Sequence, residues 1–386
     1  MPVILPDLFG QFRKFNKVKI SYLDLEKQYQ SIKTEIGEAI NEVLDQRSFI
    51  RGPHVERFEK EFARLHNVDY ALGVGNGTDA LYIALKVLEI GEGDEVITVA
   101  NSFIATSEAI TLTGARVVFA DCEVDTYCIS PSDIEAKITG KTKAIVPVHL
   151  YGHPAKMDAI MAIAKQHNLK VVEDSAQAVL AEYKGQKIGS FGDFATVSFY
   201  PGKNLGAYGD AGAILTNDKG LYTKAKMFAN HGRVSKYDHE FEGINSRMDG
   251  LQGAILNVKL KYLSSWTEQR RQVAQWYHQG LKDISQVTIP VELPNVKHVY
   301  HIYPIRVDAS VRDIFMDFLN DAGISVGIHY PIALPELKAY TYLNHRPEDF
   351  PNSTSFSKQL VSLPIYPELT LDQVKYVVST IKSFFV

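Results

Sequence analysis

Between about residue 68 and residue 174, short apolar segments alternate with longer segments whose apolar positions recur at helical spacing. The apolar segments are nearly continuous, which is typical of strands buried on both faces of a sheet. The predicted strands are 70–74, 95–99, 116–120, 143–148 and 170–173, and the predicted helices are 78–88, 103–112 and 155–167. The connections are long enough for crossover helices, so the pattern predicts an α/β fold with a mainly parallel central sheet.

The pattern changes after about residue 260. An amphipathic segment at 262–281 leads into short alternating strands near 301–307 and 325–328, and helical segments follow. A chain of 386 residues exceeds the roughly 250–300 residues over which one hydrophobic core keeps growing, so we expect two domains. The predicted parts are an extension at 1–17, a large domain at 18–260 and a smaller C-terminal α+β domain at 261–386.

Composition and charge exclude several classes of protein. Hydrophobic residues make up 45% and charged residues 22% of the chain, as in an ordinary globular protein. The net charge of −4 and the lack of a long basic run argue against nucleic-acid binding. Cys122 and Cys128 are isolated, which predicts neither a disulfide framework nor a metal site. With no apolar run of roughly 20 residues and no signal peptide, we expect a cytoplasmic protein without a membrane partner.

The segment with the clearest chemical content is 198–212, which reads SFYPGKNLGAYGDAG. The alternating run at 194–200 predicts a strand, and Pro201-Gly202 predicts a turn at its end. Lys203 follows in a segment too rich in glycine to form a helix interior. Because ligands of open parallel sheets bind at the carboxyl ends of strands, this lysine is expected to face a ligand crevice.

Three further features lie at predicted strand ends of the same sheet. Asp174 and Gln177 follow the strand at 170–173, and the segment 75–81 (GNGTDAL) opens a helix whose first N–H groups suit an anion such as phosphate. Phe103 begins another helix at this edge. Each feature has an ordinary alternative: Asp174 and the Gly-Thr-Asp sequence can serve as caps, and Phe103 can belong to the core.

The coincidence of a lysine, an acid, an aromatic ring and an anion-binding helix start favours pyridoxal phosphate as the cofactor. The lysine supplies an amine for a Schiff base, and the acid keeps the pyridine nitrogen protonated so that the ring can accept electrons. The helix start would hold the phosphate. Each residue type therefore has a physical task.

The sequence also resembles the DegT family of sugar aminotransferases, which are fold-type-I pyridoxal-phosphate enzymes with a large domain and a smaller C-terminal α+β domain. The resemblance covers nearly the whole chain and rests on the motifs at 20–25, 75–81, 148–152, 173–177 and 243–249. The segment 198–206 is the most specific of them and is most similar to members that aminate sugars at C3.

The resemblance implies a role for each cofactor residue. Lys203 would form the Schiff base and then act as the base that moves a proton. Asp174 would pair with the pyridine nitrogen, and Gln177 would bond to the phenolic oxygen. The remaining contacts would be stacking by Phe103 and phosphate binding by Gly77, Thr78, Ser198 and, from the neighbouring subunit of a homodimer, Asn245.

By the same resemblance, L-glutamate would donate its amino group to a UDP- or dTDP-linked 3-keto sugar. The product would serve amino-sugar or surface-polysaccharide biosynthesis, such as that of lipopolysaccharide O-antigen. Candidate substrate residues are His329, Tyr330 and Arg247. Two departures from the family pattern, His153 and the segment 331–335, lie where substrate selection is expected, and neutral drift explains them equally well.

Three alternatives stay open at this point. A 4-keto-sugar aminotransferase would share the cofactor residues. A pyridoxal-phosphate sugar 3-dehydratase shares the fold but carries histidine at the position of Lys203, which disfavours it. A regulator that kept the fold without activity is disfavoured by the intact Lys203, Asp174 and Gln177.

Overall fold

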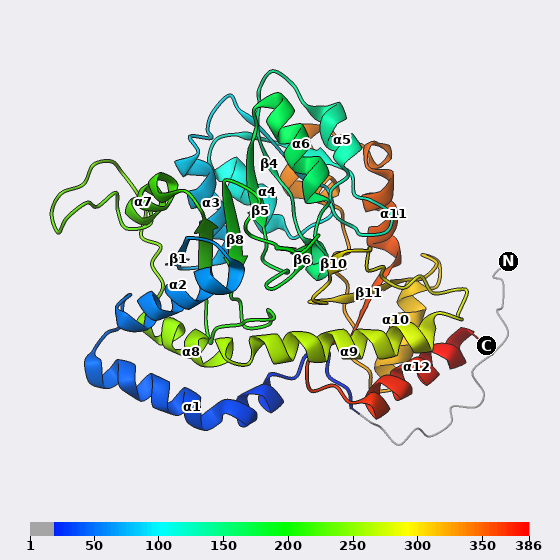
Figure 1. Ribbon diagram of the computed structural model, residues 1–386. Helices are drawn as coiled ribbons and strands as arrows, with labels where there is room; N and C mark the ends of the chain where they lie inside the picture. Colours follow the sequence, from blue (N-terminus) through cyan, green and yellow to red (C-terminus); the bar gives the residue numbers. More distant parts are fainter. Residues whose placement is uncertain (1–18, 386) are drawn as a thin grey trace.

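The computed structural model describes residues 19–385 (Figure 1), so the predicted extension at 1–17 lies outside the described residues. Its centre is a seven-stranded sheet in the order β1-β9-β8-β5-β4-β2-β3. The strands are β1 (Tyr70–Val74), β2 (Glu95–Val99), β3 (Arg116–Ala120), β4 (Thr142–Val146), β5 (Lys170–Asp174), β8 (Phe194–Ser198) and β9 (Gly212–Thr216). Six strands run in the same direction, and only β9 among the seven runs opposite to them, pairing antiparallel with both β8 and β1. The predicted mainly parallel sheet is therefore confirmed.

Helices cover both faces of this sheet, which explains the nearly continuous apolar strands. Along β5, Val171 packs into a core with α2 and α6, whereas the next residue, Val172, packs into a second core with α3 and α4. Successive strand residues point to opposite faces, so two buried faces require apolar residues at both. The helices of this part are α2 (Pro53–His66), α3 (Gly77–Val87), α4 (Ile104–Leu112), α5 (Pro131–Lys137), α6 (Met157–His167) and α7 (Lys219–Phe228).

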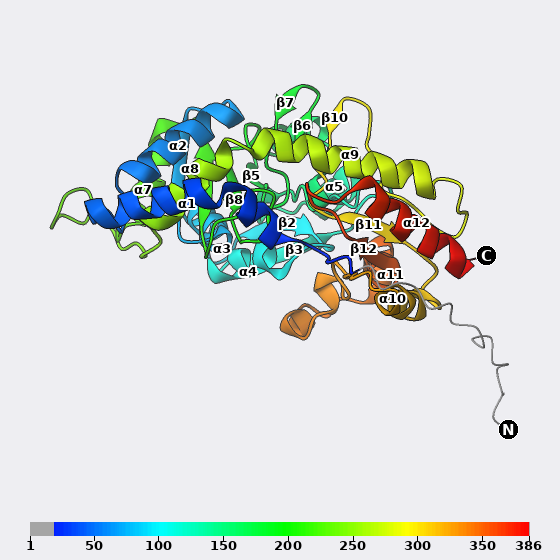
Figure 2. The same ribbon diagram turned by 90° about the horizontal axis from the view of Figure 1, so that it is seen from below.

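Two consecutive helices join the sheet to the C-terminal part. Figure 1 shows α8 (Gly250–Leu260) and α9 (Leu263–Leu281) end to end across the lower part of the molecule, beneath the central sheet. Helix α1 (Leu25–Gln46) lies along α8 (Figure 2). Its Ile32 and Ile36 pack with Ile255 and Val258 of α8 and with Trp266 of α9. The predicted boundary at residue 260 thus falls at the break between α8 and α9, and the division into two domains stays a prediction.

The C-terminal part has its own apolar core around a small antiparallel sheet. Its elements are β11 (Tyr303–Arg306), α10 (Arg312–Asp321), α11 (Pro351–Gln359), β12 (Leu360–Leu363) and α12 (Leu371–Phe385). The predicted strand at 325–328 is wrong. Only Gly327 forms an isolated bridge there, with Ser362, after which the chain leaves the sheet and carries His329 toward the cavity described below.

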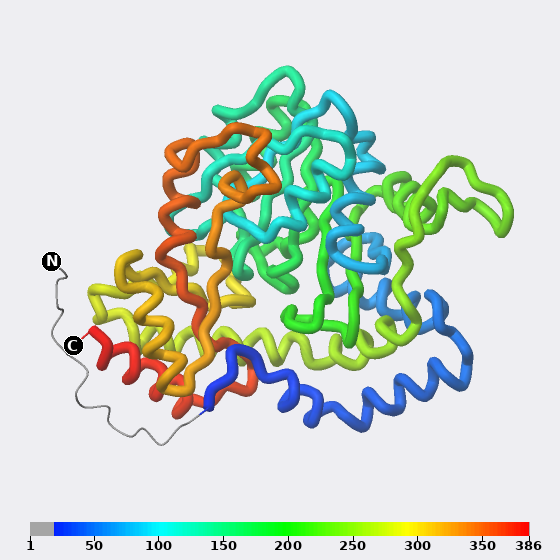
Figure 3. The backbone as a smooth tube through the Cα atoms, turned by 180° about the vertical axis from the view of Figure 1, so that it is seen from behind, coloured from blue at the N-terminus to red at the C-terminus, as the bar shows by residue number. Residues whose placement is uncertain are grey.

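Segments distant in sequence meet in both cores. Ile20, at the start of the described chain, is fully buried in the C-terminal core and pairs with Ile324. Figure 3 shows this first part of the described chain, in blue, beside the orange and red C-terminal segments. Conversely, Leu334 and Phe350, which come late in the sequence, pack into the core of the seven-stranded sheet beside α3. A minor sheet of β6 (Glu182–Tyr183), β7 (Gln186–Lys187) and β10 (Val296–Lys297) links the two parts again. Among residues 19–385, no helix combines the length and the apolar character needed to cross a membrane.

Candidate active site

A cavity of about 870 Å³ lies at the carboxyl ends of β5 and β8. Seven of the eight predicted cofactor residues line it: Gly77, Thr78, Phe103, Asp174, Gln177, Ser198 and Lys203. The C-terminal part closes the cavity with Arg270, His301, His329 and Tyr330, and the N-terminal segment adds Tyr22. The sheet and the C-terminal part therefore build one site together.

Lys203 follows β8 in a tight turn. Its backbone N–H donates to the carbonyl of Tyr200 at 2.8 Å, and Gly206 is needed nearby because a Cβ there would lie 2.3 Å from the carbonyl oxygen of Pro201. Burial lowers the pKa of the Lys203 amine to about 8, although the nearby Asp174 carboxylate acts to raise it. The site thus holds a lysine that loses its proton unusually easily.

Asp174 ends β5, beside β8, and is almost completely buried. Its Oδ2 accepts a hydrogen bond from the hydroxyl of Thr106 at 2.7 Å, and its Oδ1 accepts one from the N–H of Ala176 at 3.1 Å. The carboxylate therefore caps the following turn and also faces the cavity. Sequence reasoning missed Thr106, although it lies only three residues after Phe103, in the first turn of α4.

Gln177 links the cofactor residues to the substrate residues. Its Oε1 accepts from the N–H of Tyr151 at 2.6 Å, and its Nε2 donates to the hydroxyl of Tyr330 at 3.2 Å. The ring of Tyr330 lies 5.8 Å from that of Phe103, and the Tyr151 hydroxyl donates to the carbonyl of His329. The motif at 148–152 thus positions both the amide of Gln177 and the loop that carries His329.

The N-terminus of α3 forms a cradle for an anion. Asn76 caps the helix by accepting from the N–H of Asp79 at 2.8 Å. A Cβ on Gly77 would lie 2.7 Å from Cβ of Ser198, so only glycine lets the first turn approach β8 this closely. The Asp79 carboxylate accepts instead from the hydroxyl of Ser246, at 2.6 Å. The first N–H groups of α3 and the hydroxyls of Thr78 and Ser198 are the groups left for a phosphate.

The residues around the cavity fit pyridoxal phosphate. An amine with a lowered pKa, a buried carboxylate, an exposed aromatic ring and an anion cradle all border one space. Lys203 could hold the cofactor covalently, Asp174 could face its ring nitrogen, and Phe103 could cover one face of the ring. Among residues 19–385, no group of His, Cys, Asp and Glu side chains is arranged to hold a metal ion.

Of the predicted substrate residues, His329 and Tyr330 line the cavity. His329 Nδ1 lies 2.9 Å from the Ser362 hydroxyl, and its ring stacks on Tyr22 at 5.6 Å between centroids. Burial lowers the pKa of His329 to about 4, and the charge of Lys203 acts in the same direction. A neutral imidazole at this position can donate or accept hydrogen bonds without bringing charge.

Asn245 and Arg247 do not line this chain's own cavity. They follow the loop after α7, where Arg247 Nε donates to Asn245 Oδ1 at 2.9 Å and Asn245 is exposed. Their predicted roles therefore depend on the cavity of another copy of the chain.

The two departures from the family pattern lie away from the cavity. His153 is buried beside the ring of His298, at 5.3 Å, and its Nδ1 lies 2.7 Å from the carbonyl of Pro154. No residue of 331–335 lines the cavity. Neither feature contacts the cavity of this chain, so substrate selection by them stays a prediction beside neutral drift; His153 packs instead between the sheet and the C-terminal part.

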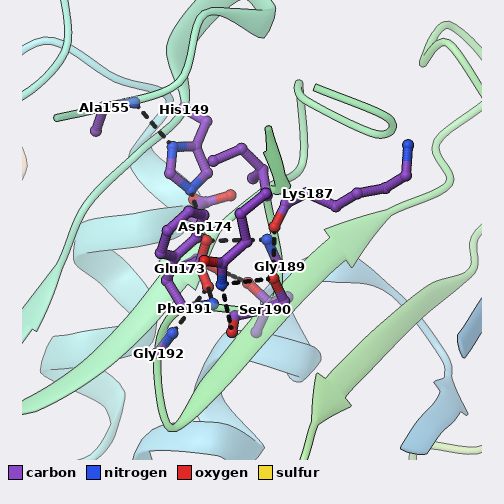
Figure 4. Close-up of polar contacts among 12 residues, drawn as sticks. His149, Ala155, Glu173, Asp174, Lys187, Gly189, Ser190, Phe191 and Gly192 are labelled. Carbon is purple, nitrogen blue, oxygen red and sulfur yellow. Dashed lines mark hydrogen bonds and ion pairs between the residues drawn. The ribbon is translucent and has the colours of Figure 1, made fainter. Parts of the chain in front are cut away.

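A second buried carboxylate lies directly behind the site (Figure 4). Glu173 points to the face of β5 opposite Asp174 and is fully buried. It accepts four hydrogen bonds: from His149 Nε2 at 3.1 Å and from the backbone N–H groups of Gly189, Phe191 and Gly192 at 2.8–2.9 Å. Burial acts to raise the pKa of Glu173, but these donors outweigh it and lower the pKa. His149, which is fully buried, serves packing and hydrogen bonding here.

Comparison with known proteins gives a consistent match. The profile of the DegT/DnrJ/EryC1/StrS aminotransferase family matches residues 30–382. The chain is 43% identical over 370 residues to a "pleiotropic regulatory protein" of Geobacillus stearothermophilus, covering 95% of this chain and 99% of that protein. It is 42% identical over 365 residues to dTDP-3-amino-3,6-dideoxy-alpha-D-galactopyranose transaminase of Aneurinibacillus thermoaerophilus, with the same two coverages.

Solved structures agree with these relatives. DesV of S. venezuelae, in complex with a ketimine intermediate, matches with a TM-score of 0.93 and 40% identity, covering 95% of this chain and 98% of that chain. The ntda protein of Bacillus subtilis, with bound cofactor PMP, matches with a TM-score of 0.89 and 32% identity, covering 96% and 87%. These matches confirm the fold-type-I class expected from the sequence and show the predicted cofactor, in its aminated form, in a homologous structure.

Proposed function

This chain belongs to the DegT/DnrJ/EryC1/StrS aminotransferase family, and from that membership we propose that it transfers the amino group of L-glutamate to C3 of a nucleotide-linked keto sugar. The general class is a pyridoxal-phosphate-dependent nucleotide-sugar aminotransferase. The observation that carries the proposal is the placement of Lys203 and Asp174 in one cavity of a chain 42% identical to a 3-amino-sugar transaminase. The nucleotide is UDP or dTDP, and the product enters amino-sugar or surface-polysaccharide synthesis.

Lys203 is the proposed proton carrier. When bound, pyridoxal phosphate supplies an electron sink for the carbon that loses its proton. With a pKa of about 8, about one Lys203 amine in four is neutral at pH 7.5, against about one in a thousand for an ordinary lysine. The carboxylate of Asp174, fixed by Thr106, would hold a proton on the ring nitrogen of the cofactor.

The homodimer is part of the proposal. Asn245 is exposed and lies outside its own cavity, yet it occupies the motif position that reaches the phosphate in the family. A second copy would bring Asn245 to the phosphate and Arg247 to the substrate. The hydrogen bond between these two side chains would hold them in a fixed orientation.

Three alternatives are weaker. Amination at C4 would use the same cofactor residues, so only the sugar-facing residues distinguish it. The relative named as a regulatory protein raises the possibility of regulation without catalysis. The intact set of Lys203, Asp174 and Gln177 around one cavity favours catalysis over regulation, and Lys203 itself argues against the 3-dehydratase.

The test starts from the absorbance of purified protein near 400 nm. We expect a band that bleaches with L-glutamate and returns with one member of a panel of UDP- and dTDP-linked 3-keto and 4-keto sugars. Lys203→Ala should remove the band and the turnover, whereas Lys184→Ala, a surface lysine paired with Asp158, should keep both. If the band returns only with 4-keto sugars, the position of amination is C4 and not C3. No band after adding pyridoxal phosphate would overturn the proposal.

A further inference from the structure

A buried cation lines the cavity without a carboxylate partner. Arg270, on α9, is 4% exposed and borders the cavity together with Tyr22 and His301. Its Nη1 donates to the carbonyls of Tyr300 at 3.3 Å and Ile365 at 3.0 Å. Among residues 19–385, no carboxylate lies within ion-pair distance of Arg270, and its other guanidinium N–H groups have no hydrogen-bond partner there.

Arg270 stays charged in this position. Burial lowers its pKa to about 10, and the more distant Glu368 and Tyr22 act to raise it, so the guanidinium is protonated at neutral pH. Burial also lowers the pKa of His301 well below its ordinary value, and the charges of Lys203 and Arg270 both add to this effect. His301 therefore lies within the electrostatic reach of both cations.

A buried charge without a partner is unfavourable, because the two backbone carbonyls replace only part of its hydration. The neighbouring Arg271 shows the ordinary solution: it donates to Glu292 Oε1 and to the carbonyl of His298, both at 2.7 Å, and does not line the cavity. The free edge of Arg270 is thus available to a ligand in the cavity.

We propose that Arg270 binds a carboxylate of the amino-acid donor. A guanidinium offers parallel N–H groups that match the two oxygens of a carboxylate, and the pairing is strongest where water is excluded. This inference rests on the proposed function, since it deepens the donor half of that reaction. The donor carries an α-carboxylate and a side-chain carboxylate, and the experiment below distinguishes them.

Three donors separate the two carboxylates. L-Norvaline lacks the side-chain carboxylate of L-glutamate, and 4-aminobutyrate lacks the α-carboxylate. In wild type, removing the carboxylate that Arg270 binds should lower kcat/KM of the donor half-reaction by about 100-fold or more. In Arg270→Gln, kcat/KM for L-glutamate should fall to the value for the analogue that lacks the carboxylate bound by Arg270. The kcat/KM for that analogue should change less than about threefold between wild type and the variant.

Binding without turnover gives an independent measurement. Glutarate should raise the Tm of the cofactor-free wild-type protein and should not raise that of Arg270→Gln. Arg270→Lys keeps the charge but not the paired N–H groups, so its Tm shift with glutarate and its kcat/KM for L-glutamate should lie between those of wild type and Arg270→Gln. If Arg270→Gln does not fold, Arg270→Lys takes its place in both measurements. Arg271→Gln is the matched control, because it removes an arginine from the same helix and should keep the donor preference.

The outcomes separate this inference from the proposed function. If wild type accepts no amino acid, the proposed function fails. If wild type works but Arg270→Gln weakens all three donors equally, or weakens only the keto-sugar half-reaction, then Arg270 supports the fold or binds the nucleotide diphosphate and the inference is overturned. Retention of the wild-type donor preference in Arg270→Gln overturns it as well.

Discussion

At the scale of single residues, two opposing effects set the pKa of the Lys203 amine. Burial lowers the pKa of its amine to about 8, and the charge of Asp174 raises it. Removing that charge should therefore lower the pKa further. A fall in the Lys203 pKa after the Asp174 charge is removed would therefore test the electrostatic contact between the two side chains directly.

The prediction concerns the cofactor-free protein. Trace acetylation between pH 6.5 and 11.5, quantified at each lysine by mass spectrometry, should give Lys203 a midpoint near pH 8 and exposed lysines midpoints near 10.4. Asp174→Asn should shift the Lys203 midpoint downward. Asp158→Asn, which removes the surface partner of Lys184, should leave it unchanged. An upward shift in Asp174→Asn would contradict the assignment.

How far the sequence predicts the site also becomes clear at this scale. Lys203, Asp174 and Gln177 are readable because each belongs to a short segment at a strand end. Thr106, Tyr151 and Arg270 were missed because their roles depend on hydrogen bonds or cavity walls between distant segments, such as the bond from Thr106 to Asp174. The packing of His153 could not be read from its motif position either, because that position says nothing about which way the ring points.

At the scale of elements, β5 carries two acids in different surroundings. Asp174 faces the cavity, and Glu173 faces inward, where one histidine and three backbone N–H groups donate to it. His149 Nδ1 accepts from the N–H of Ala155 at 3.0 Å, so its proton sits on Nε2, facing the carboxylate. Glu173 thereby ties the loop after β4 and the segment before β8 to the strand that positions Asp174.

Glu173→Gln should therefore be costly despite its similar shape. The amide keeps one acceptor and turns an N–H group toward existing donors, so the free energy of unfolding should fall by about 2–4 kcal/mol. Urea denaturation at pH 7.5 measures it. Glu182→Gln, which breaks a partly exposed pair with Lys187 at 2.8 Å, should cost less than about 1 kcal/mol. Equal losses in the two variants would show that the four-donor network contributes little.

Element types follow from the sequence more reliably than pairing does. The strands of the parallel sheet were predicted because two buried faces require apolar residues at every position. The segment 325–328 was mistaken for a strand because apolar and polar residues alternate along it. The same alternation occurs whether the backbone forms a single bridge, as Gly327 does with Ser362, or a continuous ladder of hydrogen bonds with a neighbouring strand. The antiparallel placement of β9 depends on which strand it joins, which periodicity cannot specify.

At the scale of the whole molecule, buried neutral histidines lie where the sheet and the C-terminal part meet. His153 follows β4 and contacts His298, which stacks on Tyr300 at 3.8 Å. Burial lowers the pKa of His153 to about 4 and that of His298 well below its ordinary value, and each is lowered further by neighbouring cations or histidines. The contact between the two parts thus requires uncharged imidazoles.

This requirement predicts acid sensitivity with a defined direction. Below pH 6.5 the unfolded chain binds protons that the folded chain refuses until about pH 4, so the free energy of unfolding should fall as the pH drops through that window. For His153 alone the loss approaches about 3 kcal/mol near pH 4. Urea unfolding at pH 7, 6, 5 and 4.5 measures the slope, and this range stays above the pH at which Glu173, with its lowered pKa, takes up a proton in the folded state.

A matched pair of variants assigns the slope to the contact between the two parts. His153→Asn should be less stable than wild type at pH 7, because packing is lost, but its stability should decline less steeply between pH 6.5 and 4.5. His167→Asn, at the exposed end of α6, should keep the wild-type slope. An unchanged slope in His153→Asn would leave the other histidines whose pKa burial lowers as its source: His298 in the same contact, His66 beside Ile188, and His301 and His329 at the cavity. Protection by a ligand in the cavity would single out His301 and His329, so the source of the slope also decides whether acid opens the active site or separates the parts that build it.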